Sequence, residues 1–119
     1  HSPSQSIEKH KIPMIWLGGC LEKTDTTINT YASQIDIPAT VLNQLNIKSE
    51  EFKYSKNIFS DSIRDFAFYT YNNGFGYLTD SSSVIFNNVS KKITSKSGTK
   101  IKENLKNGKA ILQSLINDF

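Results

Sequence analysis

The chain has 119 residues, of which 37% are hydrophobic, and its 14 basic and 11 acidic side chains give a formal net charge of +3. This length suits one domain with a modest core. The single cysteine, Cys20, excludes an internal disulfide and a cysteine-cluster metal site, and no apolar run approaches the roughly 18 residues that span a bilayer.

The excess of basic side chains is concentrated between Lys91 and Lys109. Such a run is typical of a solvated surface, although it also suits an anionic partner. No motif interleaves these lysines with aromatic residues, so the sequence predicts no nucleic-acid partner. Cys20 follows a Gly-Gly pair and has no recognisable base beside it, which predicts a buried or half-buried small residue rather than a reactive thiol.

Residues 1–11 are polar and predict a loop. Ile12–Leu17 is an almost continuous apolar run that ends at Gly18 and Gly19, the pattern of a short strand buried on both faces of a mainly parallel sheet. A strand of this kind needs layers above and below it, and the chain offers few helices to supply both. Without cover, its edge invites pairing with a second copy of the chain.

A helix is predicted over Asp36–Leu45. Asp36 suits the N-cap because its carboxylate can accept hydrogen bonds from amides of the first turn, and Pro38 falls where a missing donor costs nothing. The apolar side chains that follow recur at helical spacing and form one stripe: Ile37, Val41, Leu42 and Leu45. We expect the helix to end near Asn46.

Between Phe52 and Asn88 the apolar period changes to two, which predicts an antiparallel meander. The segment Asn72-Asn73-Gly74 predicts a tight turn, because Asn and Gly tolerate positive φ. The two faces of the first strand are expected to carry Phe66, Phe68 and Thr70 on one side and Ala67, Tyr69 and Tyr71 on the other. Further strands are predicted at residues 75–79, 84–86 and 92–94, with a turn at residues 80–83.

The last element is an amphipathic helix over Thr99–Asp118, which is expected to lie on the meander. Gly108 within it costs about 1 kcal/mol relative to alanine. Its apolar face is predicted to consist of Ile101, Leu105, Leu112, Leu115, Ile116 and Phe119.

Three segments carry a resemblance that covers nearly the whole chain. They are Lys11–Gly19 (KIPMIWLGG), Ser33–Ile47 (SQIDIPATVLNQLNI) and Phe66–Asp80 (FAFYTYNNGFGYLTD). Together they resemble the late part of sulfatase-type hydrolases of the alkaline phosphatase superfamily, and above all the bacterial phosphoglycerol transferase branch that includes lipoteichoic acid synthase-like proteins.

The resemblance implies that the chain is the C-terminal portion of a larger catalytic domain with an α/β fold, and that the isolated fragment is α+β. Residues 1–119 would then form a single unit made of a loop (1–11), a strand and helix (12–50), and the meander with the final helix (51–119). The remainder of the parent domain is the implied partner, and self-association through the exposed strand Ile12–Leu17 is the alternative.

For function, the resemblance implies a membrane-anchored parent enzyme whose catalytic domain faces the outside of the cell or the periplasm. That enzyme would use a divalent metal and a threonine or serine nucleophile on phosphoglycerol or sulfate esters. The metal ligands and the nucleophile lie upstream of the matching segments in this family, so the chain alone is expected to be inactive and to need no cofactor of its own.

The residues themselves predict no catalytic group and no metal ligand. Metal-assisted transfer needs several carboxylate and imidazole ligands that converge on one ion, whereas this chain has two histidines, His1 and His10, and scattered aspartates. Capping accounts for Asp36, packing for Thr40, and a turn for Ser81-Ser82-Ser83. His10 is the one candidate substrate contact, because it lies close before the apolar run at what would be a sheet edge. Trp16 and the strand aromatics are expected in the core, with stacking on a sugar or a lipid headgroup as the alternative.

Two readings of the sequence follow. The chain is either the structural C-terminal part of a metal-dependent transferase or hydrolase, or a self-sufficient α+β module that binds an anionic polymer or a partner protein. The second reading requires the chain itself to cover Ile12–Leu17. Because the chain offers little to cover this apolar run, the first hypothesis, an enzyme fragment, is favoured.

Overall fold

The computed structural model describes residues 7–19, 21 and 25–118. The chain divides into two compact units, one formed by residues up to 12 and from 66 onward and the other by residues 13–65. We call them the sheet unit and the helix–loop unit, and each is described by itself. The prediction that residues 1–119 form one unit with boundaries after residues 11 and 50 stays a prediction. The prediction for Cys20 concerns a residue outside the described part of the chain.

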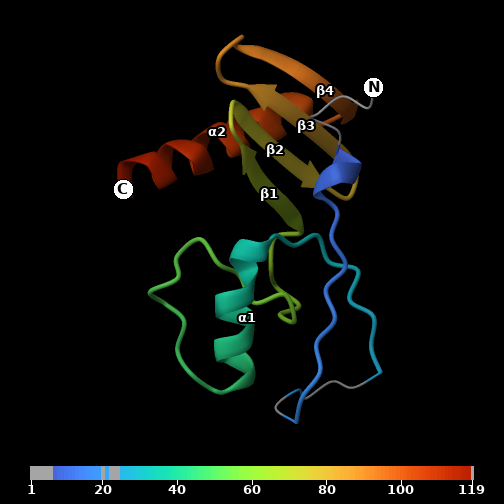
Figure 1. Cartoon of the computed structure of the whole chain (residues 1–119), viewed down its shortest axis with the longest axis vertical. Coiled ribbons are helices and arrows are strands. Elements are labelled where there is room, and N and C mark those ends of the chain that lie inside the picture. Colours follow the sequence, from blue (N-terminus) through green and yellow to red (C-terminus); the bar gives the residue numbers. More distant parts are fainter. Residues whose placement is uncertain (1–6, 20, 22–24, 119) are drawn as a thin grey trace. The chain divides into compact units, whose positions relative to one another are not determined.

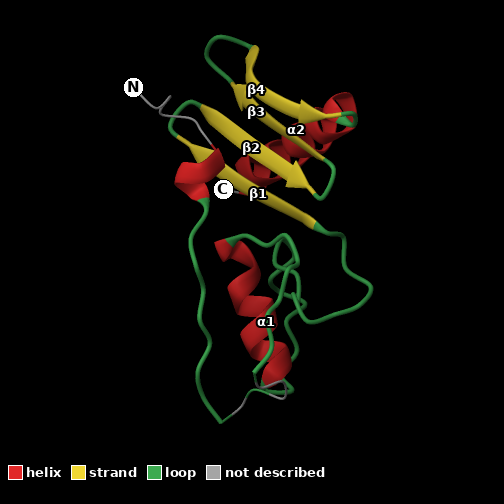
Figure 2. Ribbon diagram, turned by 90° about the vertical axis from the view of Figure 1, so that its right-hand side faces the viewer, coloured by secondary structure: helices red, strands yellow, loops and turns green. Residues whose placement is uncertain are grey.

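The sheet unit contains four strands that pair in sequence order, each antiparallel to the next (Figure 1). The order of the unit is η1 (a 3-10 helix, Ile7–His10), then β1 (Phe66–Tyr71), β2 (Gly74–Thr79), β3 (Ser82–Asn87), β4 (Lys92–Gly98) and α2 (Ile101–Asp118). Helix α2 lies across one face of this sheet (Figure 2). The predicted α+β fold, with a meander and a C-terminal amphipathic helix, is confirmed.

The first turn of the meander lies where the sequence predicted it, but the physical reason was wrong. Asn72 and Asn73 connect Tyr71 and Gly74, which are paired, yet all three residues of the Asn72-Asn73-Gly74 signal have negative φ. Gly74 is required by a close approach instead. A Cβ atom added at Gly74 would overlap the carbonyl oxygen of Phe86 and lie 2.6 Å from the hydroxyl of Tyr71.

Strand β4 is longer than predicted, and all seven of its residues are exposed. It forms the edge of the sheet next to β3, and a bulge interrupts the pairing between Ile85 and Phe86. The turn before it is closed by the side chain of Asn87, whose Oδ1 accepts hydrogen bonds from the amides of Val89 (2.9 Å) and Ser90 (2.8 Å). An edge strand needs no apolar alternation, which is why only its first three residues were predicted.

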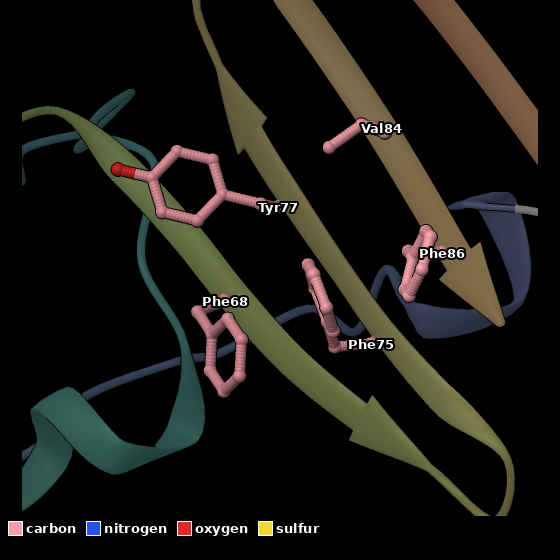
Figure 3. Packing of buried hydrophobic residues seen from close by; sticks show 5 residues of the cluster. All are labelled: Phe68, Phe75, Tyr77, Val84 and Phe86. Atoms are coloured by element: carbon pink, nitrogen blue, oxygen red, sulfur yellow. The ribbon is translucent and has the colours of Figure 1, made fainter. Parts of the chain in front are cut away.

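The core of the sheet unit is built on Phe75, whose side chain is fully buried. Its ring centroid lies 5.8 Å from that of Phe68 on β1 and 5.7 Å from that of Phe86 on β3 (Figure 3). Tyr77 and Val84 complete the buried cluster, and the apolar side of α2 covers it with Ile101, Leu105, Ile111, Leu112 and Leu115. Ile116, predicted on this side, is 61% exposed, because it lies beyond the flank that meets the sheet; Phe119 lies outside the described residues.

Gly108 allows α2 to approach the sheet closely. A Cβ atom added there would overlap the ring of Phe75. The residue that lowered the helix propensity of the sequence is therefore the one that lets the helix lie directly on the central core residue.

The helix–loop unit contains η2 (Gln34–Asp36), which leads into α1 (Ile37–Gln44). Helix α1 ends as predicted near Asn46, which adopts a left-handed φ of 55°. The amide of Ile47 donates to the carbonyl of Leu42 at 2.8 Å and that of Asn46 to the carbonyl of Asn43 at 3.1 Å, the pair of bonds that ends a helix in a Schellman motif. Residues 48–65, which include the predicted start of the meander, form turns rather than strands.

The predicted buried strand Ile12–Leu17 is wrong for this structure. These residues have no strand assignment, and Ile12, Ile15 and Leu17 are 60%, 82% and 92% exposed. An apolar run favours burial, but a strand also needs a neighbouring strand with which to form hydrogen bonds. The four described strands pair only with one another. The predicted stripe of α1 is also not its buried side, since Ala39 and Thr40 are buried and Leu45 is exposed.

We predict that Gly108→Ala destabilises the protein although alanine is the better helix former. The helix gains about 1 kcal/mol in propensity, but the overlap with Phe75 costs about 1–3 kcal/mol, so a net loss is expected in urea unfolding. Ser114→Ala, on the exposed side of α2, is the control and is expected to be neutral or slightly stabilising. A more stable Gly108→Ala variant would contradict the close packing.

Candidate functional site

The face of the sheet opposite α2 carries a second aromatic layer, which we call the tyrosine face. It consists of Tyr69 and Tyr71 on β1, Gly74 and Gly76 on β2, Ile85 on β3, and His10. Tyr69 pairs with Gly76 and Tyr71 with Gly74, and Cβ atoms at either glycine would overlap or crowd these rings. The two phenol rings therefore lie across the strand next to them, and Ile85, which pairs with Gly76, is only 1% exposed.

His10 is placed on this face by η1. Its imidazole ring stacks on Tyr69, with the ring centroids 4.0 Å apart and the planes inclined by 21°, and the residue is exposed to solvent. The sequence had placed His10 beside a buried strand that the structure does not contain. A role for His10 as a substrate contact stays a prediction, now with Tyr69 as its neighbour.

The two tyrosines differ in how their hydroxyl groups are satisfied. Tyr71 Oη donates to the carbonyl oxygen of Phe86 at 3.0 Å, whereas Tyr69 Oη is buried without a hydrogen-bond partner among the described residues. Burial, and then the nearby Tyr71, raises the pKa of Tyr69 to about 12. Burial also raises the pKa of Tyr71, against a hydrogen bond with Thr94 that lowers it. At neutral pH both phenols stay protonated, so the tyrosine face can stack on a ligand but supplies no base.

A buried polar cluster lies in the helix–loop unit and fixes the chain after α1 against the helix. Asp36, only 3% exposed, accepts hydrogen bonds from the amide of Ser33 (2.8 Å) and from the amide and ammonium groups of Lys56 (both 3.1 Å). Asp36 makes no capping bond to α1, which corrects the prediction. The amide of Ala39 donates instead to Ser55 Oγ at 2.9 Å.

Thr40 is fully buried, as the sequence predicted. Its hydroxyl donates to the carbonyl of Asp36 at 2.7 Å and accepts from the amide of Ile58 at 3.1 Å. Of the predicted serine turn, Ser82 and Ser83 are buried in β3, and Ser82 Oγ donates to the carbonyl of Ser97 at 3.0 Å. The hydroxyl groups of Thr40 and Ser82 thus connect backbone segments by hydrogen bonds, which is a structural role.

An apolar groove of about 370 Å³ also lies in the helix–loop unit. Trp16, half buried, packs edge-to-face on Phe59 with the ring centroids 6.0 Å apart. The groove is lined by Met14, Ile15, Trp16, Leu17, Leu21, Ile37, Val41 and Gln44. Ile37 and Val41, the predicted core stripe of α1, thus form one wall of this groove.

Two further observations concern the described part of the chain. No three histidine, cysteine, aspartate or glutamate side chains within it are grouped so that they could hold a metal ion. No helix within it is long and apolar enough to cross a membrane.

Comparison with known proteins yields no relative: no protein-family model, no curated protein and no solved structure matches the chain.

Sequence reasoning missed the tyrosine face as a unit. The alternation of Tyr69 and Tyr71 was visible, and so was the Gly-Phe-Gly segment of β2, but only the register of the two strands brings each ring over a glycine. A pair of glycines two residues apart in a strand, facing two aromatic residues two apart in its neighbour, is the signal that would have found it.

We predict that Tyr69→Phe leaves stability at pH 7 unchanged or higher, because a buried hydroxyl group without a partner is removed. Between pH 10 and 12 the unfolded chain releases the Tyr69 proton while the folded protein keeps it, so this group makes stability fall as pH rises. The free energy of unfolding in urea should therefore decline less steeply over this range in the variant.

Tyr71→Phe is the matched control. It removes the hydrogen bond to Phe86 and should cost about 0.5–1.5 kcal/mol at pH 7. Equal losses in the two variants would mean that Tyr69 Oη has a partner.

Thr40→Val is predicted to destabilise the helix–loop unit by about 1–3 kcal/mol, because the buried amide of Ile58 loses its acceptor. Amide exchange of Ile58, followed by NMR, should accelerate in this variant. Thr40→Ser keeps the hydroxyl group and should leave that amide protected, so equal acceleration in both variants would argue against the bond.

Proposed function

We propose that this chain is the C-terminal structural part of a metal-dependent phosphoglycerol transferase or sulfatase-like enzyme, which acts on phosphate or sulfate esters at the cell envelope. The chain alone is inactive. In this proposal the parent is anchored in the membrane, its catalytic domain faces away from the cytoplasm, and its divalent metal and hydroxyl nucleophile are supplied by residues upstream of residue 1. The basis is the resemblance of Lys11–Gly19, Ser33–Ile47 and Phe66–Asp80.

One structural observation carries the proposal furthest. Ile15 and Leu17 are almost fully exposed, and with Trp16 they border the apolar groove. Burying a large apolar side chain is worth about 1.5–3 kcal/mol, so an apolar segment of this kind favours a partner that covers it. The remainder of the parent catalytic domain, which in the proposal supplies the sheet that this segment enters, meets that need.

The sheet unit has a separate role in the proposal. Its meander and C-terminal helix correspond to the small subdomain that the resemblance implies beside the active-site cleft. His10 is the residue we propose as a substrate contact, since its exposed imidazole ring is already held by Tyr69. The chain contributes support and one contact, and no catalytic group.

The test begins with the gene upstream of residue 1. Expression of the complete reading frame should give hydrolysis of a phosphoglycerol lipid or an aryl sulfate that EDTA abolishes and a divalent metal restores, whereas the 119-residue chain should be inactive. A start codon or a secretory leader directly before residue 1, or a complete protein without metal-dependent ester cleavage, would overturn the proposal.

Variants of the complete protein test the cover over the apolar segment. Leu17→Lys should sharply reduce soluble, active enzyme, because it would bury a charge. Val89→Lys, which changes another exposed apolar residue (75%, against 92% for Leu17) in the turn before β4, should be tolerated. Equal tolerance of both variants would mean that Leu17 is not covered.

The second candidate is a self-sufficient binding module for an anionic polymer or a partner protein. It is favoured by the uneven distribution of charge: the sheet unit carries nine basic and four acidic side chains, a net charge of +5, while the helix–loop unit carries five and seven. This candidate requires the chain itself to cover Ile12–Leu17, whereas Ile15 and Leu17 are 82% and 92% exposed. A complete reading frame without metal-dependent ester cleavage, together with a 119-residue chain that sediments as a folded monomer, would favour it over the enzyme.

A further inference from the structure

Three lysines follow one another along a single flank of α2. Lys102, Lys106 and Lys109 are spaced i, i+4, i+7 and are all exposed. At about 100° per residue they lie roughly 100–160° to one side of Gly108, the residue that rests on the sheet. Glu103 and Asp118, the two acidic residues of the helix, fall on the other side.

Contacts with the sheet show which side of the helix this is. Gly108 lies on Phe75 of β2, and Lys109 Nζ lies 4.4 Å from the ring centroid of Phe86, which belongs to β3. The flank with the lysines is therefore on the side of the edge strand β4. Figure 2 shows α2 crossing behind the sheet, with one of its ends close to β4.

Strand β4 adds a lysine to the same side. Lys96 pairs with Val84, and cross-strand partners share a face of the sheet. Since Val84 is buried under α2, Lys96 also stands on the face that α2 covers. We call this group the lysine flank: Lys96, Lys102, Lys106 and Lys109.

Lys100 and part of the lysine flank are unfavourable for the fold, whereas the contact of Lys109 with the ring of Phe86 is favourable. Lys100 accepts the first helical hydrogen bond, from the amide of Asn104 at 2.9 Å, so Lys100 and Lys102 lie at the positive end of the helix dipole, where a cation is unfavourable by about 0.3–1 kcal/mol. Lys102 and Lys106 form a like-charge i, i+4 pair, which costs a further few tenths of a kcal/mol. No ion pair joins any of the four to a described carboxylate.

The geometry favours an extended ligand. Lys102 and Lys109 are about 10 Å apart along the helix axis, at 1.5 Å per residue. Lys96 lies on β4, on the same face of the sheet as the helix. The apolar side of α2 is packed on the sheet, so the helix has no face to insert into a bilayer. The aromatic residues of the tyrosine face lie on the other side of the sheet, so no stacking platform for bases adjoins the lysines.

We propose that the lysine flank binds a linear polyanion whose phosphate or sulfate groups are spaced along its length. Lysine ammonium groups act on such a chain as point charges, and release of the ions condensed on the polymer supplies much of the affinity. The inference deepens the second candidate function, because it names the side chains and the chemistry that would hold an anionic polymer. It requires no catalysis, so the site would also be present in an enzyme fragment.

The test titrates the 119-residue chain calorimetrically with polyphosphate, with heparin and with phosphatidylglycerol vesicles, at 50 and 200 mM salt. The triple variant Lys102→Gln, Lys106→Gln, Lys109→Gln should bind at least tenfold more weakly at 50 mM salt. Its slope of log K against log salt should be shallower by about 2–3, because up to three ionic contacts are lost. Circular dichroism checks that the variant is folded.

The control removes the same charge elsewhere: Lys9→Gln, Lys48→Gln, Lys53→Gln, three exposed residues outside the flank. It should change affinity less than threefold. Preference for polyphosphate or for heparin identifies phosphate or sulfate as the recognised group, and either supports the site. Equal weakening by both triple variants, no binding of either polymer at 50 mM salt, or binding only to phosphatidylglycerol vesicles would overturn it.

Discussion

The contact between Gly108 and the ring of Phe75 fixes the geometry of the sheet unit. Phe75 occupies the middle of the sheet between Phe68 and Phe86, and a helix that carried a side chain at position 108 would have to stand farther away. Its apolar residues would then lose contact with the core. The same approach brings Lys109 over Phe86 and so determines which flank of the helix faces β4. A packing constraint in the core thereby sets the charge pattern of the surface.

Much of the sheet unit could be predicted because its signals are local. Alternation over Phe66–Tyr71 and helical spacing over the last twenty residues specify elements whose partners are adjacent in sequence, and the meander then follows. Ile12–Leu17 was mispredicted for the complementary reason: its apolar character is local, but a strand exists only where another strand offers it a ladder. Strand β4 was predicted too short because an exposed edge strand can have a polar sequence, which lacks the apolar alternation that indicates a strand.

The candidate site was harder to predict because it depends on pairing between distant residues. His10 was singled out, but its neighbour Tyr69 lies 59 positions away, and no periodicity connects them. Gly74 was explained by turn conformation, whereas its negative φ and the position of Tyr71 show that it makes room for a ring. Asp36 likewise fits the pattern of a cap, yet its carboxylate accepts hydrogen bonds from Ser33 and Lys56. The amide of Ala39 in the first turn of the helix donates to Ser55 instead.

The hydrogen bond from the amide of Ala39 to Ser55, sixteen residues later, makes α1 dependent on the loop that contains Ser55. A helix of eight residues is too short to persist alone in water, so α1 gains its order only when residues 55–58 dock on it. Helix α1 and residues 55–58 should then form and unfold together in one cooperative step, and the helix should not form first as a nucleus to which the loop is added. During synthesis, α1 would stay unformed until the chain has emerged as far as Ile58, whose buried amide donates to Thr40 of the helix.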